Sequence, residues 1–133
     1  MIVALHVATG AAAGALAGSR GRATALGLAL HALGDAIPHG ETDDRDFEIA
    51  SGVALLALLA ATHGPLHPAV VGAAASAAPD LEHVLPLPKP GGRDLFPSHR
   101  VPGWHRSGGI PAWVQLVAAG VIVGLLISRG REL

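Results

Sequence analysis

The sequence predicts an all-α protein built as a multi-pass transmembrane bundle of about five short helices. Residues of the types AVILMFWYC make up 50% of the 133-residue chain, and charged residues only 14%, against about 25% charged in an average soluble domain. Five apolar segments recur along the chain, with polar stretches between them. These segments carry hardly any charge between their ends, so they lack the polar face that a helix of a soluble bundle presents to water.

The five apolar segments define the expected helices of a single membrane-embedded domain. They cover residues 2–18, 23–38, 47–62, 65–79 and 110–128 of the domain 1–133. Only the last, at about 19 residues, has the length that a spanning helix needs, whereas the others run to about 15–17 residues and would be short spans. A soluble, Ala-rich bundle of buried helices is the alternative architecture.

Each segment has its own local justification. Residues 2–18 read as a mature helix, because a signal peptide would need a positively charged stretch before the apolar run. Small residues in ATGAAAGALAG, and in VVGAAASAA of 65–79, have spacings that let helix backbones approach closely in lipid. The acidic stretch before 47–62 reads as a solvated loop with a capping carboxylate at Asp46. Residues 80–109 are too rich in Pro and Gly for a long helix, and their three histidines indicate a functional loop before the last helix.

Charge suggests an orientation for these helices. If all five segments span, Arg20, Arg22, Arg129 and Arg131 lie on one face, which the positive-inside rule assigns to the cytoplasm. Four basic residues in the loop 80–109 are an opposing signal. We therefore expect a multi-pass cell-membrane protein whose loop 80–109 lies on the non-cytoplasmic face.

That same face gathers most of the side chains able to bind a metal. Six of the eight histidines fall there. His31 and Asp35 are four positions apart and Asp80 and His83 three, so each pair shares a helical face. The gathered residues are His6, His31, Asp35, His39, Asp80, His83, His99 and His105. Two ligand pairs from two helices are a usual way to build a metal site in a bundle.

The residue types indicate a divalent metal site and argue against nucleic-acid binding. With no cysteine in the chain, the ligands are imidazole and carboxylate, which suit zinc first and manganese or iron as alternatives. Such a site can hold water and lower its pKa toward neutrality, as a hydrolase requires. The simpler interpretation of His31 and Asp35 is a hydrogen bond that locks two helices. A net charge of −1 and a single lysine argue against nucleic acid as a partner.

Two local motifs resemble known metalloenzymes. HALGDAIPH resembles the H-x-L-G-D-x-x-Q-P-x-H segment of zinc-dependent phospholipase C and its nuclease relatives, although its second histidine, His39, comes two residues earlier. AAPDLEHVLP followed by PSHRVPGWHR resembles the P-D-x-D-H and H-R-x-x-x-H segments of the small inner-membrane metal-dependent hydrolases. This resemblance implies a ligand set of His6, His31, Asp35, Asp80, His83, His99 and His105.

The expected function is a membrane-bound metal-dependent hydrolase acting on a phosphoester or lipid-linked substrate, with membrane lipids as further partners. Glu82 does not share a helical face with both Asp80 and His83, so it is a weaker candidate ligand than they are, and it is expected among the catalytic residues. Arg100 and Arg106 each follow a candidate ligand and could clamp a phosphate or anchor to lipid head groups. The alternatives are a non-enzymatic membrane metal-binding or metal-transport protein and a purely structural bundle; the oligomeric state stays open.

Overall fold

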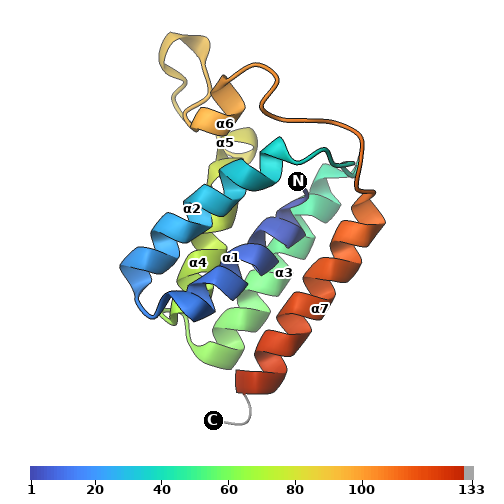
Figure 1. Ribbon diagram of the computed structural model, residues 1–133. Coiled ribbons are helices and arrows are strands. Elements are labelled where there is room, and N and C mark those ends of the chain that lie inside the picture. The colour runs from blue at the N-terminus through green and yellow to red at the C-terminus, as the bar shows by residue number, and fades with distance from the viewer. Residues whose placement is uncertain (131–133) are drawn as a thin grey trace.

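The computed structural model describes residues 1–130, and over that range it contains helices and no strand (Figure 1). Five long helices follow the order of the five apolar segments. They are α1 (Val3–Ala17), α2 (Arg20–Ala36), α3 (Arg45–His63), α4 (Pro68–Ala77) and α7 (Ala112–Gly130). Arg131, which entered the orientation argument, lies outside the described residues.

The Pro- and Gly-rich segment between α4 and α7 forms only short helices. They are η1 (Ala78–Asp80), α5 (Leu81–Val84), η2 (Pro90–Gly92) and α6 (Pro97–Arg100). None of the four exceeds four residues. The expectation that this segment lacks a long helix is therefore correct, and its backbone folds over one end of the bundle (Figure 1).

Two helices reach membrane-spanning length. Within residues 1–130, α3 and α7, with 19 residues each, are long and apolar enough to cross a membrane. The other three long helices, α1, α2 and α4, have 15, 17 and 10 residues, against about 20 for a straight span. The fourth helix is shorter than the segment 65–79 because Gly64 ends α3 and His67 caps α4 just before Pro68.

Helix caps explain where two of the long helices begin. Ser19 accepts a hydrogen bond from the backbone N–H of Arg22, so α2 starts three residues earlier than the apolar segment does. Asp44 accepts one from the N–H of Phe47 and caps α3. The expected cap at Asp46 was therefore wrong: Asp46 lies inside the first turn, where its negative charge is still favourable beside the helix N-terminus.

The first helix is the centre of the bundle, in contact with each of the other long helices. Its approach to α4 depends on glycine: a Cβ atom at Gly10 would lie 2.4 Å from the carbonyl oxygen of Gly72, and one at Gly72 would lie 2.3 Å from that of Gly10. Gly14 meets the Pro68 carbonyl at 2.2 Å in the same way. The small-residue stretches thus bring these two backbones together, as expected from their spacing.

The alternating direction of the long helices brings five of their ends together. The start of α1, the end of α2, the start of α3, the end of α4 and the start of α7 lie at one end of the bundle, beside α5 and α6 (Figure 1). His63 and His67 lie at the opposite end, where their rings stack with centroids 5.0 Å apart. We call the end beside α5 and α6 the site end.

Candidate metal centre at the site end

Five ionisable side chains from four elements meet at the site end. They are His6 of α1, His31 and Asp35 of α2, Asp80 of η1 and His99 of α6, which together we call the central cluster. The helix spacing explains the α2 pair, because residues four apart lie on one face. Loop folding supplies the last member, since α6 places His99 against α2.

The Asp35 carboxylate lies in the middle of this cluster and is only 1% exposed. Its Oδ2 atom is 3.0 Å from His31 Nε2 and 3.4 Å from His99 Nε2. The same oxygen accepts a hydrogen bond from the Ser98 hydroxyl at 2.9 Å. On the other side, Oδ1 lies 3.2 Å from His6 Nε2. One carboxylate thus faces three histidines.

Hydrogen bonds to the outer nitrogens fix how two of the rings face the cluster. His31 Nδ1 lies 2.8 Å from the carbonyl oxygen of Ser76, and His99 Nδ1 contacts Glu82 Oε1. Both partners are acceptors, so each Nδ1 carries the proton and each Nε2 presents a lone pair in the neutral ring. Those two Nε2 atoms lie 3.1 Å apart. Two lone pairs at that distance repel each other unless a proton or a metal ion lies between them.

Electrostatics at His99 agree with that requirement. Burial by itself lowers the pKa of His99, but its contacts with Asp35 and Glu82 outweigh burial and raise it. The pKa of Glu82 is lowered in turn: burial would raise it, and hydrogen bonds from His99 and from the backbone N–H groups of Leu95 and Phe96 prevail. The carboxylates around His99 therefore favour positive charge at this position.

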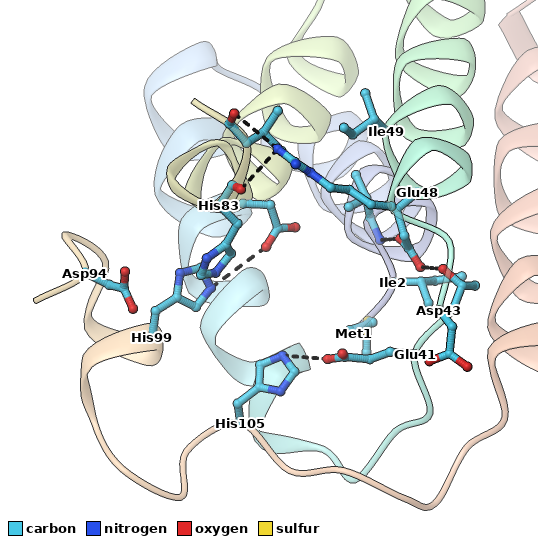
Figure 2. Close-up of a pocket in the computed structure, with 15 residues that line it drawn as sticks. Met1, Ile2, Glu41, Asp43, Glu48, Ile49, His83, Asp94, His99 and His105 are labelled. Carbon is cyan, nitrogen blue, oxygen red and sulfur yellow. Dashed lines mark hydrogen bonds and ion pairs between the residues drawn. The ribbon is translucent and has the colours of Figure 1, made fainter. Parts of the chain in front are cut away.

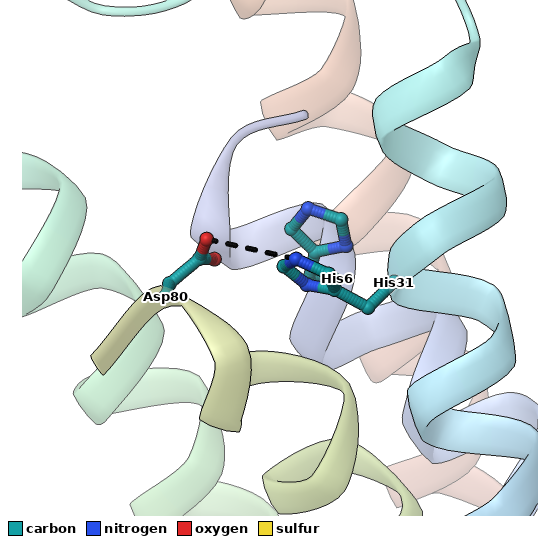
Figure 3. Close-up of side chains that lie close together, drawn as sticks. All are labelled: His6, His31 and Asp80. Atoms are coloured by element: carbon teal, nitrogen blue, oxygen red, sulfur yellow. Dashed lines mark ion pairs between the residues drawn. The ribbon is translucent and has the colours of Figure 1, made fainter. Parts of the chain in front are cut away.

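The two remaining members of the cluster have polar atoms without partners. Within residues 1–130, Nδ1 of the fully buried His6 has no partner, and its Nε2 has only the contact with Asp35 Oδ1 at 3.2 Å. Its ring stacks on that of His31 with centroids 4.1 Å apart (Figure 3). Asp80 Oδ1 lies 3.9 Å from His31 Nε2 and 3.8 Å from His99 Nε2, whereas Oδ2 is buried and has no partner in the described chain. Burial raises the pKa of Asp80 to about 6.

Such buried, unpartnered groups are rare in proteins and call for an explanation. One ligand atom from each of His6, His31 and Asp80 can be chosen so that all lie within 4.8 Å of one another, and the same holds for His31, Asp35 and His99. These are the distances of a set of donors around one ion. The central cluster can therefore hold a metal with imidazole and carboxylate ligands.

Three further residues of the expected ligand set lie around this cluster. His83 is exposed, with its ring centroid 4.4 Å from that of His99. His39 and His105 lie on the other side of Asp35, with ring centroids 4.7 Å apart. Together with Glu41 they form a second group of possible ligands, which we call the outer cluster.

The residues expected to be catalytic occupy different positions. Glu82 is 4% exposed and its oxygens are engaged by His99, Leu95 and Phe96, so it orients a histidine of the cluster. Arg100 and Arg106 are exposed and do not line the cavity beside the cluster. The backbone of Arg106 holds the loop in place: its N–H donates to the carbonyl of Asp35, and its carbonyl accepts from the N–H of His39.

A cavity of about 540 Å³ opens beside both clusters (Figure 2). In Figure 2, His83 and His99 lie together, apart from the pair formed by His105 and Glu41. Five carboxylates line the cavity: Glu41, Asp43, Glu48, Asp80 and Asp94. In the described chain, Arg45 is the one arginine or lysine of the lining, and it donates to the carbonyl oxygens of His83 and Val84. The amino group of Met1 is a second cation of the lining, so carboxylates outnumber cations and the cavity is acidic.

Sequence reasoning did not select Ser76, Ser98 or Glu41 as parts of a site. The contributions of Ser76 and Ser98 depend on tertiary contacts, and nothing in their local sequence signals them. Glu41 could have been found, because it lies two positions after His39 in the stretch that carries the α2 ligands.

No protein-family model, curated protein or solved structure matches this chain.

Proposed function

We propose that the protein is a membrane-bound, metal-dependent hydrolase whose divalent ion is held by the central cluster. The observation that carries the proposal is the facing pair His31 Nε2 and His99 Nε2, 3.1 Å apart, with Asp35 Oδ2 at 3.0 and 3.4 Å from them. In a tetrahedral zinc site with bonds of about 2.0–2.1 Å, neighbouring ligand atoms lie about 3.3 Å apart. The three donor atoms already have this spacing.

The donor set favours zinc, with manganese or iron as alternatives. It contains imidazole and carboxylate and no sulfur, which suits all three metals. When bound, such an ion polarises a phosphoryl or carbonyl oxygen and makes nearby water more acidic. Asp80 lines the cavity, and burial raises its pKa to about 6, so its carboxylate is the candidate base that would accept a proton from water beside the ion.

Two observations support a membrane location. The spanning-length windows of α3 and α7 are only 11% and 17% buried inside the fold, whereas the core helix of a soluble protein is mostly buried. Large apolar side chains therefore point outward, among them Val53 of α3 and Val117 of α7 at 61% and 58% exposure. A lipid environment would cover these surfaces, and water would not.

The substrate we propose is a lipid or lipid-linked phosphoester. An apolar groove of about 240 Å³ adjoins the acidic cavity and shares Val3, Ile49, Asp80 and Val84 with it. Its other walls are apolar residues of α1, α3, α4 and α5, including Leu56. An amphiphile could place its polar group in the cavity and its chain in the groove. Since the cavity lining is acidic, an anionic head group would depend on the positive charge of the metal.

Arg100 and Arg106 have no part in this proposal, because neither lines the cavity. Arg45 is an arginine of the cavity lining, although its guanidinium is engaged by two carbonyl groups. Its charge would add to that of the metal. The phosphate clamp expected from the sequence therefore moves from the loop arginines to the metal and Arg45.

The proposal is tested by hydrolysis assays on detergent-purified, zinc-loaded protein. We expect release of phosphate from phosphatidic acid, and loss of that activity in Asp35→Asn. The change Val53→Trp fills the apolar groove, so it should raise KM for phosphatidic acid and leave the hydrolysis of the water-soluble ester p-nitrophenyl phosphate unchanged. Metal-loaded protein that is inert toward phosphomonoesters, phosphodiesters and carboxylic esters would instead favour a metal-binding or transport role.

A further inference from the structure

The outer cluster is built in the same way as the central one. His39 is only 1% exposed, and its Nδ1 donates to the carbonyl oxygen of Ile37, so the lone pair of Nε2 faces inward, where the amino group of Met1 contacts it. Glu41 Oε1 lies 3.6 Å from His39 Nε2 and 3.3 Å from His105 Nε2. Two imidazole nitrogens thus face one carboxylate oxygen.

The backbone on both sides of the outer cluster is fixed. The His39 N–H donates to the carbonyl of Arg106, and the Gly40 N–H donates to that of Ile110. This pairing ties the chain after α2 to the chain before α7, so His39 and His105 are held across from each other. His39, whose spacing departs from the phospholipase C segment, is therefore held in place by backbone hydrogen bonds.

Asp35 connects the two clusters. Its Oδ2 faces His31 and His99, whereas its Oδ1 lies 3.6 Å from His105 Nε2. The amino group of Met1 also reaches this side, 3.3 Å from Oδ1 and in contact with His39 Nε2, so it places a positive charge where the second ion would bind and would have to give way to that ion. The two oxygens of one buried carboxylate thus point at two separate groups of nitrogen donors.

We propose that a second divalent cation binds at the outer cluster, held by His39, Glu41 and His105, with Asp35 bridging it to the ion of the central cluster. A carboxylate that gives one oxygen to each ion suits the separation of about 3.5–4 Å found in two-metal hydrolytic sites. The inference rests on the proposed function for its first ion.

The surroundings favour a second positive charge. Glu41 and His105 line the same acidic cavity as Asp80 and His99, so both ions would border one space. An anionic phosphoester would then meet two cations in place of the unbalanced carboxylates. Glu41 and His105 are 59% and 40% exposed on their side chains, so the second ion should bind more weakly and exchange faster than the first.

The test is the number of Mn²⁺ ions bound by detergent-purified protein, measured by isothermal titration together with electron paramagnetic resonance. We expect the wild-type chain to bind two ions, the second with lower affinity, and to show the spin coupling of a manganese pair. The change His105→Ala affects a half-exposed side chain, so the fold should persist. It should lower the affinity for the second ion by about tenfold or more, abolish the spin coupling and leave the first ion bound.

Control variants make the outcomes distinct. His63→Ala removes a histidine at the opposite end and should still bind two coupled ions; Glu41→Gln should act like His105→Ala. A single uncoupled ion in the wild-type chain at saturating metal, or two coupled ions in both outer variants, would overturn the second site. Because no activity is measured, a chain with two coupled ions and no hydrolysis would contradict only the proposed reaction.

Discussion

His31 and His99 are 68 positions apart in the chain, yet their Nε2 atoms lie 3.1 Å from each other. Each ring is held from behind by an acceptor, the carbonyl of Ser76 for His31 and the carboxylate of Glu82 for His99. Carboxylates and carbonyls that bind the outer nitrogen of a metal-ligating histidine set its tautomer and strengthen it as a donor.

The contact between Glu82 and His99 should matter for metal affinity. Glu82→Gln keeps a hydrogen-bond acceptor but removes the charge that strengthens His99, so zinc should bind about 10- to 100-fold more weakly. Glu48→Gln is the matched control, because Glu48 lines the same cavity but bonds to Thr42 and the Val3 N–H, away from the cluster. Competition titration against a chromophoric chelator measures both constants. Equal zinc affinity in the two variants would show that Glu82 has no supporting role.

Metal removal should destabilise the fold, because the ligands come from α1, α2, η1 and α6 and the ion binds them only when they are assembled. Ligand binding to the native state alone contributes about 4 kcal/mol when free ligand exceeds Kd by 1,000-fold. We expect dialysis against a chelator to lower the Tm in detergent and added zinc to restore it. His31→Ala should show no such response to zinc, whereas His63→Ala should respond like the wild type. An unchanged Tm after chelation would argue against a buried ion.

The packing of α1 on α4 should not tolerate a methyl group. Gly72→Ala places a Cβ atom 2.3 Å from the Gly10 carbonyl oxygen, and overpacking of this kind costs about 1–3 kcal/mol of unfolding free energy. Gly120→Ala is the control: within the described chain its Cβ meets nothing within 4 Å, and removing a helical glycine gains about 0.5–1 kcal/mol. Thermal unfolding should therefore shift in opposite directions for the two variants. A Gly72→Ala protein as stable as Gly120→Ala would contradict the close approach.

A substitution on the exposed face of α7 can distinguish a helix that lies in a membrane from one that faces water. Val121 lies at the middle of α7 and is 56% exposed. In a bilayer, Val121→Lys should cost about 2.5–3.5 kcal/mol, whereas on a water-facing surface it should change stability by less than about 0.5 kcal/mol. Retention in the membrane fraction after carbonate washing, compared with Val121→Leu, reads out the difference. Full recovery of both variants in the soluble fraction would contradict the membrane assignment.

The sequence was sufficient for the helix order and for the parts of the site that obey helical spacing. His31 and Asp35 share a face because they are one turn apart, and apolar runs with glycines predicted the close packing of α1. Residues 80–109 obey no such period, so the inward position of His99 required the folded loop. Arg100 follows His99 by one position, about 100° around the helix, which explains why it points away from the cavity. Ser98 and the Ser76 carbonyl act only through tertiary contacts, which leave no local pattern.

The most direct test of the account is the metal content of the purified protein. Detergent-solubilised wild-type protein, loaded with zinc and passed through a desalting column, should retain at least one equivalent by elemental analysis. The double variant His31→Ala, His99→Ala should retain none at the central cluster, and His63→Ala should match the wild type. Wild-type protein that retains no zinc, or a double variant that retains as much as the wild type, would contradict the central claim.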